Sequence, residues 1–252
     1  MVERTPTGIY GLDELLGGGF PKRRNVLVAG ACGTGKSIFG MQFLYRGATE
    51  YDEPGVYVTF DEITDKIRMD MLNFGWNVKD VEDRGSLALV DAASARAGLP
   101  SEEEHSMLPG QLDFDKVMVD ILSICKHMGA KRLVIDSIPA MGFQLDKNLD
   151  IRRTILKLAY IISRSGMTCI MITEVGEQQI GSGQTVMFSK YEVEEYVADG
   201  VLLFNFLGVG SGATRTLYIR KMRGTDHSLE IHPMEIVTGK GIVVKKIEYV
   251  FK

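Results

Sequence analysis

The segment Gly30–Ser37, which reads GACGTGKS, limits the folds open to this chain more than any other feature. It has the G-x-x-x-x-G-K-S spacing of a phosphate-binding loop, with the apolar run NVLVA before it and the helix-like run SIFGMQFLYRGA after it. Its glycines let backbone N–H groups approach phosphate oxygens, and the N-terminus of the following helix adds partial positive charge. We therefore expect Lys36 to reach the β- and γ-phosphates of a nucleotide and Ser37 to ligate Mg²⁺.

The pattern around this loop predicts an α/β domain. Continuous apolar runs, typical of buried parallel strands, occur at Asn25–Ala29, Val56–Phe60, Leu87–Val90, Arg132–Ile135 and Thr168–Thr173. Helical spacing of apolar residues lies between them, at residues 67–74, 117–128 and 151–162. For the last of these helices, Asp150 is a plausible N-cap and Gly166 a plausible stop. Such alternation favours a mainly parallel sheet flanked by helices.

Beyond Gly200 the pattern changes to strands separated by turn signals, with no helix between them. The runs GVLLFNF, TRTLYIRKMR and GIVVKKIEYVF are strand-like. We interpret them as a C-terminal antiparallel extension of the same sheet, so residues 1–252 are expected to form a single domain.

Composition excludes several classes of protein. The chain has 252 residues, is 45% hydrophobic and carries a formal net charge of -4, which does not suggest a nucleic-acid coat or a membrane-surface protein. Its three cysteines form no CxxC pair, which is typical of a reduced, cytoplasmic protein without a disulfide framework. The first residues contain no apolar signal region, and we find no apolar run of the roughly 20 residues that span a bilayer.

Acidic residues follow two of the predicted strands. Asp136 ends the run RLVID, where a carboxylate would hold Mg²⁺ beside Ser37, usually through water. Asp61 and Glu62 follow the run VYVTF, at the strand end where open α/β sheets place their ligands. One of the two could polarise a water for in-line attack on a γ-phosphate, although a solvated turn is an equal alternative from chemistry alone.

A second group of charges lies in the segment LYIRKMRGTDH, residues 217–227. On an extended strand Leu217, Ile219, Lys221 and Arg223 would share one face, which begins apolar and ends in two cations. These cations point either at solvent, as at many strand ends, or at an anion.

Taken together, the runs TGIYGLDELLGGGF, GACGTGKS, VTFDE, LVIDS, EEYVADGVLLF and KMRGTDH resemble the KaiC family of RecA-like P-loop ATPases over essentially the whole chain. The resemblance implies a RecA-like fold, Mg-dependent ATP hydrolysis and a homohexameric ring with ATP at the subunit interfaces. It implies that the phosphates and metal are bound by Gly33, Thr34, Gly35, Lys36, Ser37 and Ile38. Asp61 and Glu62 match the paired catalytic glutamates of the family. A neighbouring subunit's ATP would be contacted by Lys221, Met222, Arg223, Thr225 and His227.

Two departures from the family pattern affect function. The first acid of the catalytic pair is Asp61 rather than glutamate, and its shorter side chain favours Glu62 as the residue that positions water. Where the clock protein's second domain has an autophosphorylated Ser-Thr pair, this chain has Glu194 and Glu195. Autophosphorylation there is therefore not expected, although Ser182, Thr185 and Ser189 lie nearby in the sequence.

Three classes of function remain open: an ATPase ring that signals to an unidentified protein partner, a RecA-like DNA-handling ATPase, and an autokinase. The two loops that would hold DNA in a RecA-like ring are not basic. Residues 174–198 contain five glutamates and one lysine, and residues 137–150 contain two aspartates and one lysine. Since phosphate binding needs the opposite sign, the sequence disfavours nucleic acid as a partner. Trp76 is expected to pack in the core, and His105 and His127 to lie at the surface.

Overall fold

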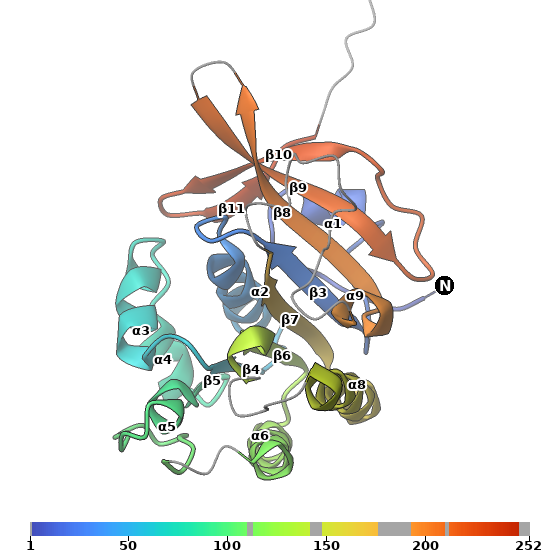
Figure 1. Cartoon of the computed structure of the whole chain (residues 1–252). Coiled ribbons are helices and arrows are strands. Elements are labelled where there is room, and N and C mark those ends of the chain that lie inside the picture. Colours follow the sequence, from blue (N-terminus) through green and yellow to red (C-terminus); the bar gives the residue numbers. More distant parts are fainter. Residues whose placement is uncertain (1, 110–112, 142–147, 176–192, 210–211, 247–252) are drawn as a thin grey trace, which may run out of the picture.

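The computed structural model describes residues 2–109, 113–141, 148–175, 193–209 and 212–246, except for the side chains of residues 148–151, 208, 209 and 212. Nine strands form one sheet in the order β11-β10-β9-β8-β3-β7-β6-β4-β5 (Figure 1). The predicted parallel strands are β3 (Asn25–Gly30), β4 (Gly55–Thr59), β5 (Leu87–Asp91), β6 (Arg132–Asp136) and β7 (Thr168–Glu174). All four pairings among them are parallel, which confirms the predicted fold class.

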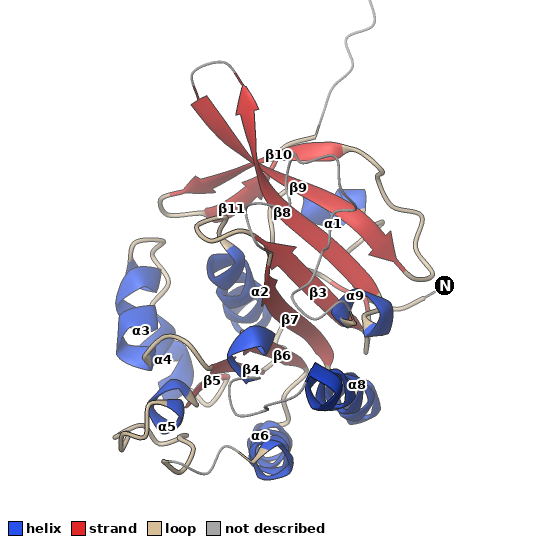
Figure 2. Cartoon of the chain, viewed as in Figure 1, coloured by secondary structure: helices blue, strands red, loops and turns tan. Residues whose placement is uncertain are grey.

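The C-terminal strands extend this sheet rather than forming another. β8 (Gly200–Val209) pairs parallel with β3, and then β9 (Gly212–Met222), β10 (Ile231–Val237) and β11 (Gly241–Val244) continue antiparallel. The long β8–β9 pair is visible at the top of Figure 2, where it projects past its neighbours. The predicted antiparallel extension is confirmed.

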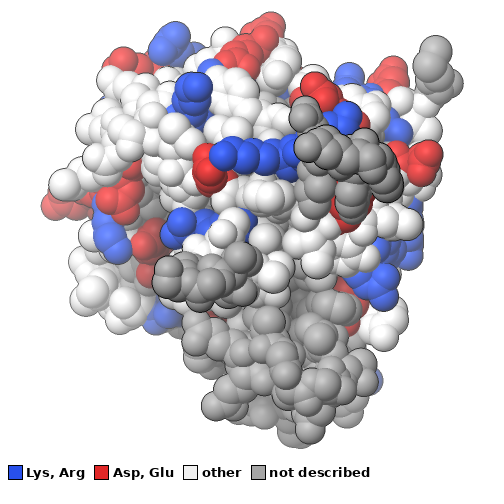
Figure 3. Space-filling view, turned by 90° about the horizontal axis from the view of Figure 1, so that it is seen from above, with Lys and Arg blue, Asp and Glu red and all other residues white. Residues whose placement is uncertain are grey.

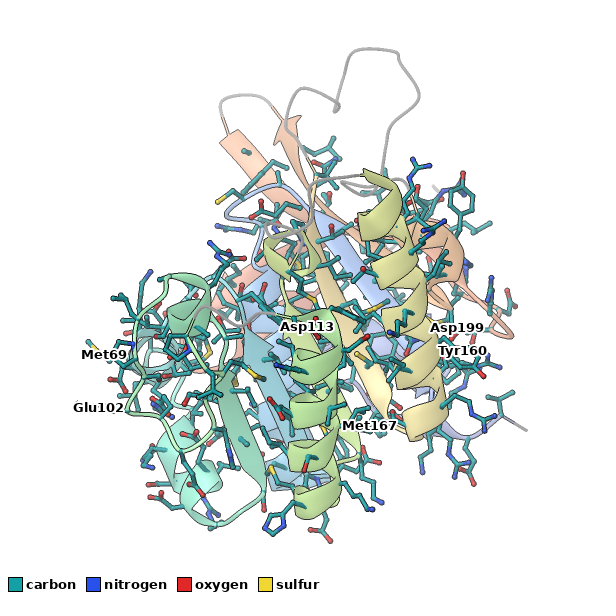
Figure 4. All side chains as sticks on the ribbon, turned by 60° about the horizontal axis from the view of Figure 1, so that its bottom comes forward. Met69, Glu102, Asp113, Tyr160, Met167 and Asp199 are labelled. Atoms are coloured by element: carbon teal, nitrogen blue, oxygen red, sulfur yellow. The ribbon has the colours of Figure 1, made fainter. Side chains whose placement is uncertain are left out.

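Helices cover both faces of the sheet because each buried strand presents apolar side chains to both sides. The first face carries the core residues of α1 (Leu12–Leu15), α2 (Lys36–Glu50), α3 (Thr64–Leu72) and α4 (Val78–Asp83). The second carries α5 (Ala93–Arg96), α6 (Phe114–Met128), α7 (Ile138–Met141), α8 (Asn148–Ser165) and α9 (Glu194–Val197). Figure 4 looks onto the second face, with Asp113 at the start of α6 and Tyr160 on α8.

The N-terminal segment packs across the edge of the large sheet. β1 (Arg4–Thr5) and β2 (Phe20–Pro21) form a separate two-stranded sheet. Between them, Tyr10 bridges to Val243 of β11 and its carbonyl accepts from Val244 N at 2.8 Å. This contact covers the outer strand, which would otherwise expose unpaired backbone groups.

Two local predictions are wrong. Asp150 does not cap α8, because the helix begins at Asn148, although Gly166 follows its last residue as expected. Leu217, Ile219, Lys221 and Arg223 do not share one face, because a bulge interrupts the pairing of β9 with β8. Leu202 pairs with Ile219 but Val201 pairs with Lys221, so Arg220 is an extra residue.

The bulge moves Lys221 to the other face of the sheet. Leu217, Ile219 and Met222 belong to the core under α2, whereas Val201, the pairing partner of Lys221, belongs to the core under α8 and α9. The cation is consequently brought to α9, a contact that strict alternation along the strand does not predict.

Candidate nucleotide site

The predicted phosphate-binding loop joins β3 to α2. Gly33 and Gly35 have φ of 76° and 101°, left-handed values that side-chain-bearing residues rarely adopt. The loop is braced from inside, because Thr34 Oγ1 and Lys36 Nζ donate to the carbonyl of Ala31 at 2.8 and 2.9 Å. Lys36 is 8% exposed, and this burial lowers the pKa of its ammonium group, while Glu174 and Asp136 act in the opposite direction.

Asp136 lies beside this loop at the end of β6. Its Oδ2 accepts from the hydroxyl of Tyr57 at 2.6 Å, and Ser37 of α2 lines the same cavity. Burial raises the pKa of Asp136, an effect that the nearby hydroxyl groups of Tyr57 and Ser37 oppose. A hydroxyl and a carboxylate are the oxygen ligands that Mg²⁺ prefers, so Ser37 and Asp136 fit the metal that the sequence predicts.

The paired acids Asp61 and Glu62 follow β4 on the same edge of the sheet. Both carboxylate oxygens of Asp61 have a partner: Oδ1 pairs with Arg96 at 2.7 Å, and Oδ2 accepts from the hydroxyl of Ser137 at 2.7 Å. Glu62 instead pairs with Lys66 at 3.1 Å, an i,i+4 contact between two exposed side chains. The carboxylate of Glu62 is therefore the easier one to release toward a substrate water.

These groups line one cavity of about 440 Å³. It brings together the predicted residues Gly33, Gly35, Lys36, Ser37, Ile38, Asp61, Glu62 and Asp136. Several of its residues were not predicted: Cys32, Thr59, Ser137, Ile172, Glu174, Arg215 and Ile236. Glu174 could have been found, since it ends the run TCIMITE as Asp136 ends RLVID.

Arg215 could not have been found from local sequence. It sits on β9 opposite Phe206 of β8, and its Nε donates to the carbonyl of Gly33 at 3.2 Å. Its guanidinium also lies 5.4 Å from the ring centroid of Phe206. The pairing of β8 with β9 brings this cation to the phosphate-binding loop, and that pairing is a tertiary feature.

The second predicted group of cations lies at the opposite end of the sheet. Met222 at the end of β9 pairs with Gly200, which is level with Val26 at the start of β3, whereas the phosphate-binding loop follows Gly30. Val26 and Gly30 are separated by about 13 Å, at roughly 3.3 Å per strand residue. Lys221 and Arg223 are thus not brought to the cavity of their own chain.

At that end the cations are held by polar groups of their own chain. Lys221 Nζ donates to the carbonyls of Glu195 and Ala198 at 3.0 and 2.7 Å, and burial lowers the pKa of its ammonium group. Arg223 contacts Asp199 at 3.4 Å, a carboxylate that also pairs with Arg24 at 3.1 Å. Asp199 is labelled in Figure 4, close to α9.

Three further residues predicted to contact a neighbouring subunit's nucleotide lie beside Lys221 and Arg223 in the sequence. Thr225 Oγ1 accepts from Arg4 of β1 at 2.6 Å, and His227 Nδ1 lies 2.9 Å from the carbonyl of Ser228. The Met222 side chain is 4% exposed and packs in the core, and the Met222 carbonyl accepts from Thr225 N at 3.1 Å.

Other sequence predictions have clear outcomes. Trp76 is 2% exposed and stacks on Tyr45 with ring centroids 5.7 Å apart, so its predicted packing role is confirmed. His127 is exposed, His105 is half-buried, and the described residues contain no group of side chains that could hold a metal through histidine, cysteine or several acids. Ser182, Thr185 and Ser189 lie outside the described residues, as do most of the two loops considered for DNA. In the described part of the chain, no helix is long and apolar enough to cross a membrane.

Comparison with known proteins identifies the family. A sequence profile of the family described as "ATPase: KaiC" matches residues 5–249. The UPF0273 protein of Aeropyrum pernix is 38% identical over 97% of this chain and 94% of its own length. The circadian clock oscillator protein KaiC of Thermostichus vulcanus is 36% identical over 96% of this chain, but only 44% of its own length is covered.

A solved structure gives the same result for the fold. The crystal structure of a KaiC-like protein from Pyrococcus horikoshii superposes with a TM-score of 0.82 at 37% identity, covering 98% of this chain and all of that one. The chain therefore belongs to the KaiC family of ATPases, with a RecA-like fold.

Proposed function

We propose that this protein binds ATP with Mg²⁺ in the cavity beside Lys36 and hydrolyses it at the interfaces of a homo-oligomeric ring. The observation that carries the proposal is the separation of two complementary groups. The phosphate-binding loop and the acids lie at one end of the sheet, and Lys221 and Arg223 at the other. Such a chain can complete its site when the cation end of one subunit meets the cavity of the next.

The residues of the cavity have distinct roles in this reaction. Backbone N–H groups of residues 33–38 and the ammonium of Lys36 bind the phosphates. Ser37 and Asp136 would hold Mg²⁺, which supplies charge neutralisation at the β- and γ-phosphates. Glu62 orients a water and accepts its proton as the water oxygen bonds to the γ-phosphorus. The bond from the γ-phosphorus to the bridging oxygen breaks, and ADP leaves with that oxygen.

Arg223 of the neighbouring subunit supplies further positive charge for this step, in addition to Lys36 and Arg215 of the cavity. A guanidinium from a neighbouring subunit can form two parallel hydrogen bonds to phosphoryl oxygens as negative charge develops there, and such residues contribute roughly 10³–10⁵ in rate. Lys221 adds a point charge beside it. To act in this way both side chains must exchange their contacts with Asp199 and α9 for contacts with the neighbour's nucleotide.

Mixing two inactive variants tests the proposal. Arg223→Ala should bind ATP but lose hydrolysis, and Glu62→Gln should do the same for a different reason. In a mixed ring, some interfaces pair an intact cavity with an intact Arg223, so activity should return on mixing and rise with subunit exchange. Cross-linking each preparation before mixing should prevent recovery.

The contrary outcomes are equally specific. If the mixture stays inactive although exchange is demonstrated by fluorescence transfer between labelled subunits, the two groups do not act across an interface. Normal hydrolysis by Arg223→Ala would show that the cation has no part in the reaction.

A protein partner that responds to the shape of the ring completes the proposal, and nucleic acid is disfavoured. On the face shown in Figure 3, acidic and basic side chains are interspersed and form no basic stripe among the described residues. Glu194, the first residue of α9, is fully buried at the place where a phosphorylated residue would be needed, which argues against an autokinase at this position.

A further inference from the structure

We propose that Tyr57 is a positioning residue for the metal site, which it serves by fixing the carboxylate of Asp136. The inference rests on the proposed function, because it concerns the Mg²⁺ that accompanies ATP. The sequence predicts no site role for Tyr57, which lies in the middle of the apolar strand β4.

The strand register brings the two side chains together. Tyr57 pairs with Val134 of β6, and Asp136 lies two residues further along β6, on the same face of the sheet. The ring of Tyr57 is 1% exposed, yet its hydroxyl reaches Asp136 Oδ2 at 2.6 Å. A phenol in an otherwise apolar core position needs a partner for its O–H group, and here a single carboxylate oxygen supplies it.

Helix α2 closes this arrangement from the other side. Gly40 faces the strands, and a Cβ there would lie 2.9 Å from Val134 Cγ1 and 3.5 Å from Tyr57 Cε2. The absence of a side chain at Gly40 therefore lets α2 lie close to the Tyr57 ring. Ser37, one turn earlier on α2, lines the same cavity as Asp136.

The consequence for the metal follows from the geometry of a carboxylate. The terminal torsion of aspartate is broad, so the group turns easily unless its oxygens are held. Tyr57 occupies Oδ2 from the core side, which leaves Oδ1 for the metal-bound water or the metal. Groups that orient a metal ligand in this way typically change metal affinity by about 10- to 100-fold when they are removed.

Tyr57→Phe deletes the one hydroxyl and keeps the ring. We expect Mn²⁺, used as a paramagnetic substitute for Mg²⁺, to bind the complex of this variant with ADP about 10- to 100-fold more weakly than it binds the wild-type complex. Free Mn²⁺ measured by electron paramagnetic resonance gives this affinity without any turnover. ADP affinity in excess EDTA should be unchanged, because the phosphate-binding loop is untouched.

Tyr45→Phe is the matched control. It also removes one phenol oxygen from the packed layer around α2, but Tyr45 stacks on Trp76 away from the acids. We expect its Mn²⁺ affinity to match wild type. Equal Mn²⁺ affinity of Tyr57→Phe and wild type would overturn the inference, as would an equal loss of ADP affinity in EDTA, since that would indicate a general packing defect.

A double-mutant cycle with Asp136→Asn separates positioning from packing. If Tyr57 acts through the carboxylate, Tyr57→Phe should have little further effect on Mn²⁺ affinity in the Asp136→Asn background, and additive losses would contradict the proposal. Failure of the proposed function has a different signature. In that case wild-type protein itself would show no ADP-dependent Mn²⁺ binding, and both proposals would fall together.

Discussion

At the scale of single residues, Asp61 and Glu62 are neighbours in the chain with different surroundings. Asp61 is held by Arg96 and Ser137, one partner on each carboxylate oxygen. The ion pair of Glu62 with Lys66 is solvent-exposed, and such pairs contribute about 0–1 kcal/mol, so it can be broken at little cost. In the proposed reaction this asymmetry favours Glu62 as the residue that positions the water and a structural role for Asp61.

Glu62→Gln should consequently bind ATP as wild type does and hydrolyse it far more slowly, by the roughly 10²–10⁴ that a general base contributes. Asp61→Asn should retain more activity, because its amide can still accept from one of the two partners. Single-turnover hydrolysis and a separate nucleotide-binding measurement distinguish the two steps. An inactive Asp61→Asn beside an active Glu62→Gln would reverse the assignment.

Lys36→Ala should lose most ATP binding. Lys36 Nζ donates to the carbonyl of Ala31 and lies in the cavity, where it can turn to phosphate oxygens. Titration with a fluorescent ATP analogue measures the loss, and thermal unfolding without nucleotide shows whether the loop still folds. If Lys36→Ala bound ATP as tightly as wild type, the assignment of this cavity as the nucleotide site would be contradicted.

At the scale of elements, α2 is fixed against the sheet by a close approach at its C-terminal half. A Cβ on Gly47 would lie 2.5 Å from both Cδ and Nε of Arg132. Arg132 has no exposed surface and cannot move away freely, because Nε donates to Glu53 at 2.7 Å and NH1 to the carbonyl of Phe43 at 2.7 Å. Its guanidinium also lies 4.4 Å from the ring centroid of Phe43.

Gly47→Ala should therefore destabilise the protein, although alanine favours a helix by about 1 kcal/mol over glycine. Overpacking of a filled core costs about 1–3 kcal/mol, and displacing a buried, paired arginine adds to it. Urea unfolding measures the difference, with Thr49→Ala on the exposed side of α2 as the control. A variant more stable than wild type would mean that Arg132 has room to relax.

At the scale of the whole molecule, the proposed site is divided between the two ends of the sheet, which would meet at an interface between subunits. We expect ATP with Mg²⁺ to promote a ring, because bound nucleotide offers phosphate to Lys221 and Arg223 of the next subunit. Light scattering after size-exclusion chromatography should show a larger species with ATP and Mg²⁺ than without them, and Arg223→Ala should weaken this assembly. A monomer under all conditions would remove the interface site.

The charge distribution leads to a further expectation at this scale. The loops considered for DNA carry more acids than bases, so DNA binding at physiological salt should be weak. Fluorescence anisotropy with labelled single-stranded and double-stranded DNA measures it at several salt concentrations. Sub-micromolar binding with a steep salt dependence would favour the DNA-handling alternative.

The sequence by itself determined the parts of this protein that depend on contiguous residues. These parts are the phosphate-binding loop, the acids that follow β4 or end β6, and the succession of strands and helices along the chain. They follow from local patterns, because backbone conformation and burial are set by near neighbours in these segments. The same holds for β8, β9 and β11, which match short apolar runs separated by turn signals, whereas β10 (Ile231–Val237) was not predicted from the sequence.

Only the tertiary structure decided which distant residues meet. Arg215 reaches the cavity because β9 pairs with β8, Tyr57 reaches Asp136 because β4 pairs with β6, and a bulge opposite Val201 turns Lys221 toward α9. The ion pair of Asp61 with Arg96 likewise joins residues that are distant in the sequence. Strand register and bulges are set by the packing of the whole core. They cannot be predicted from the alternation of side chains along a single strand.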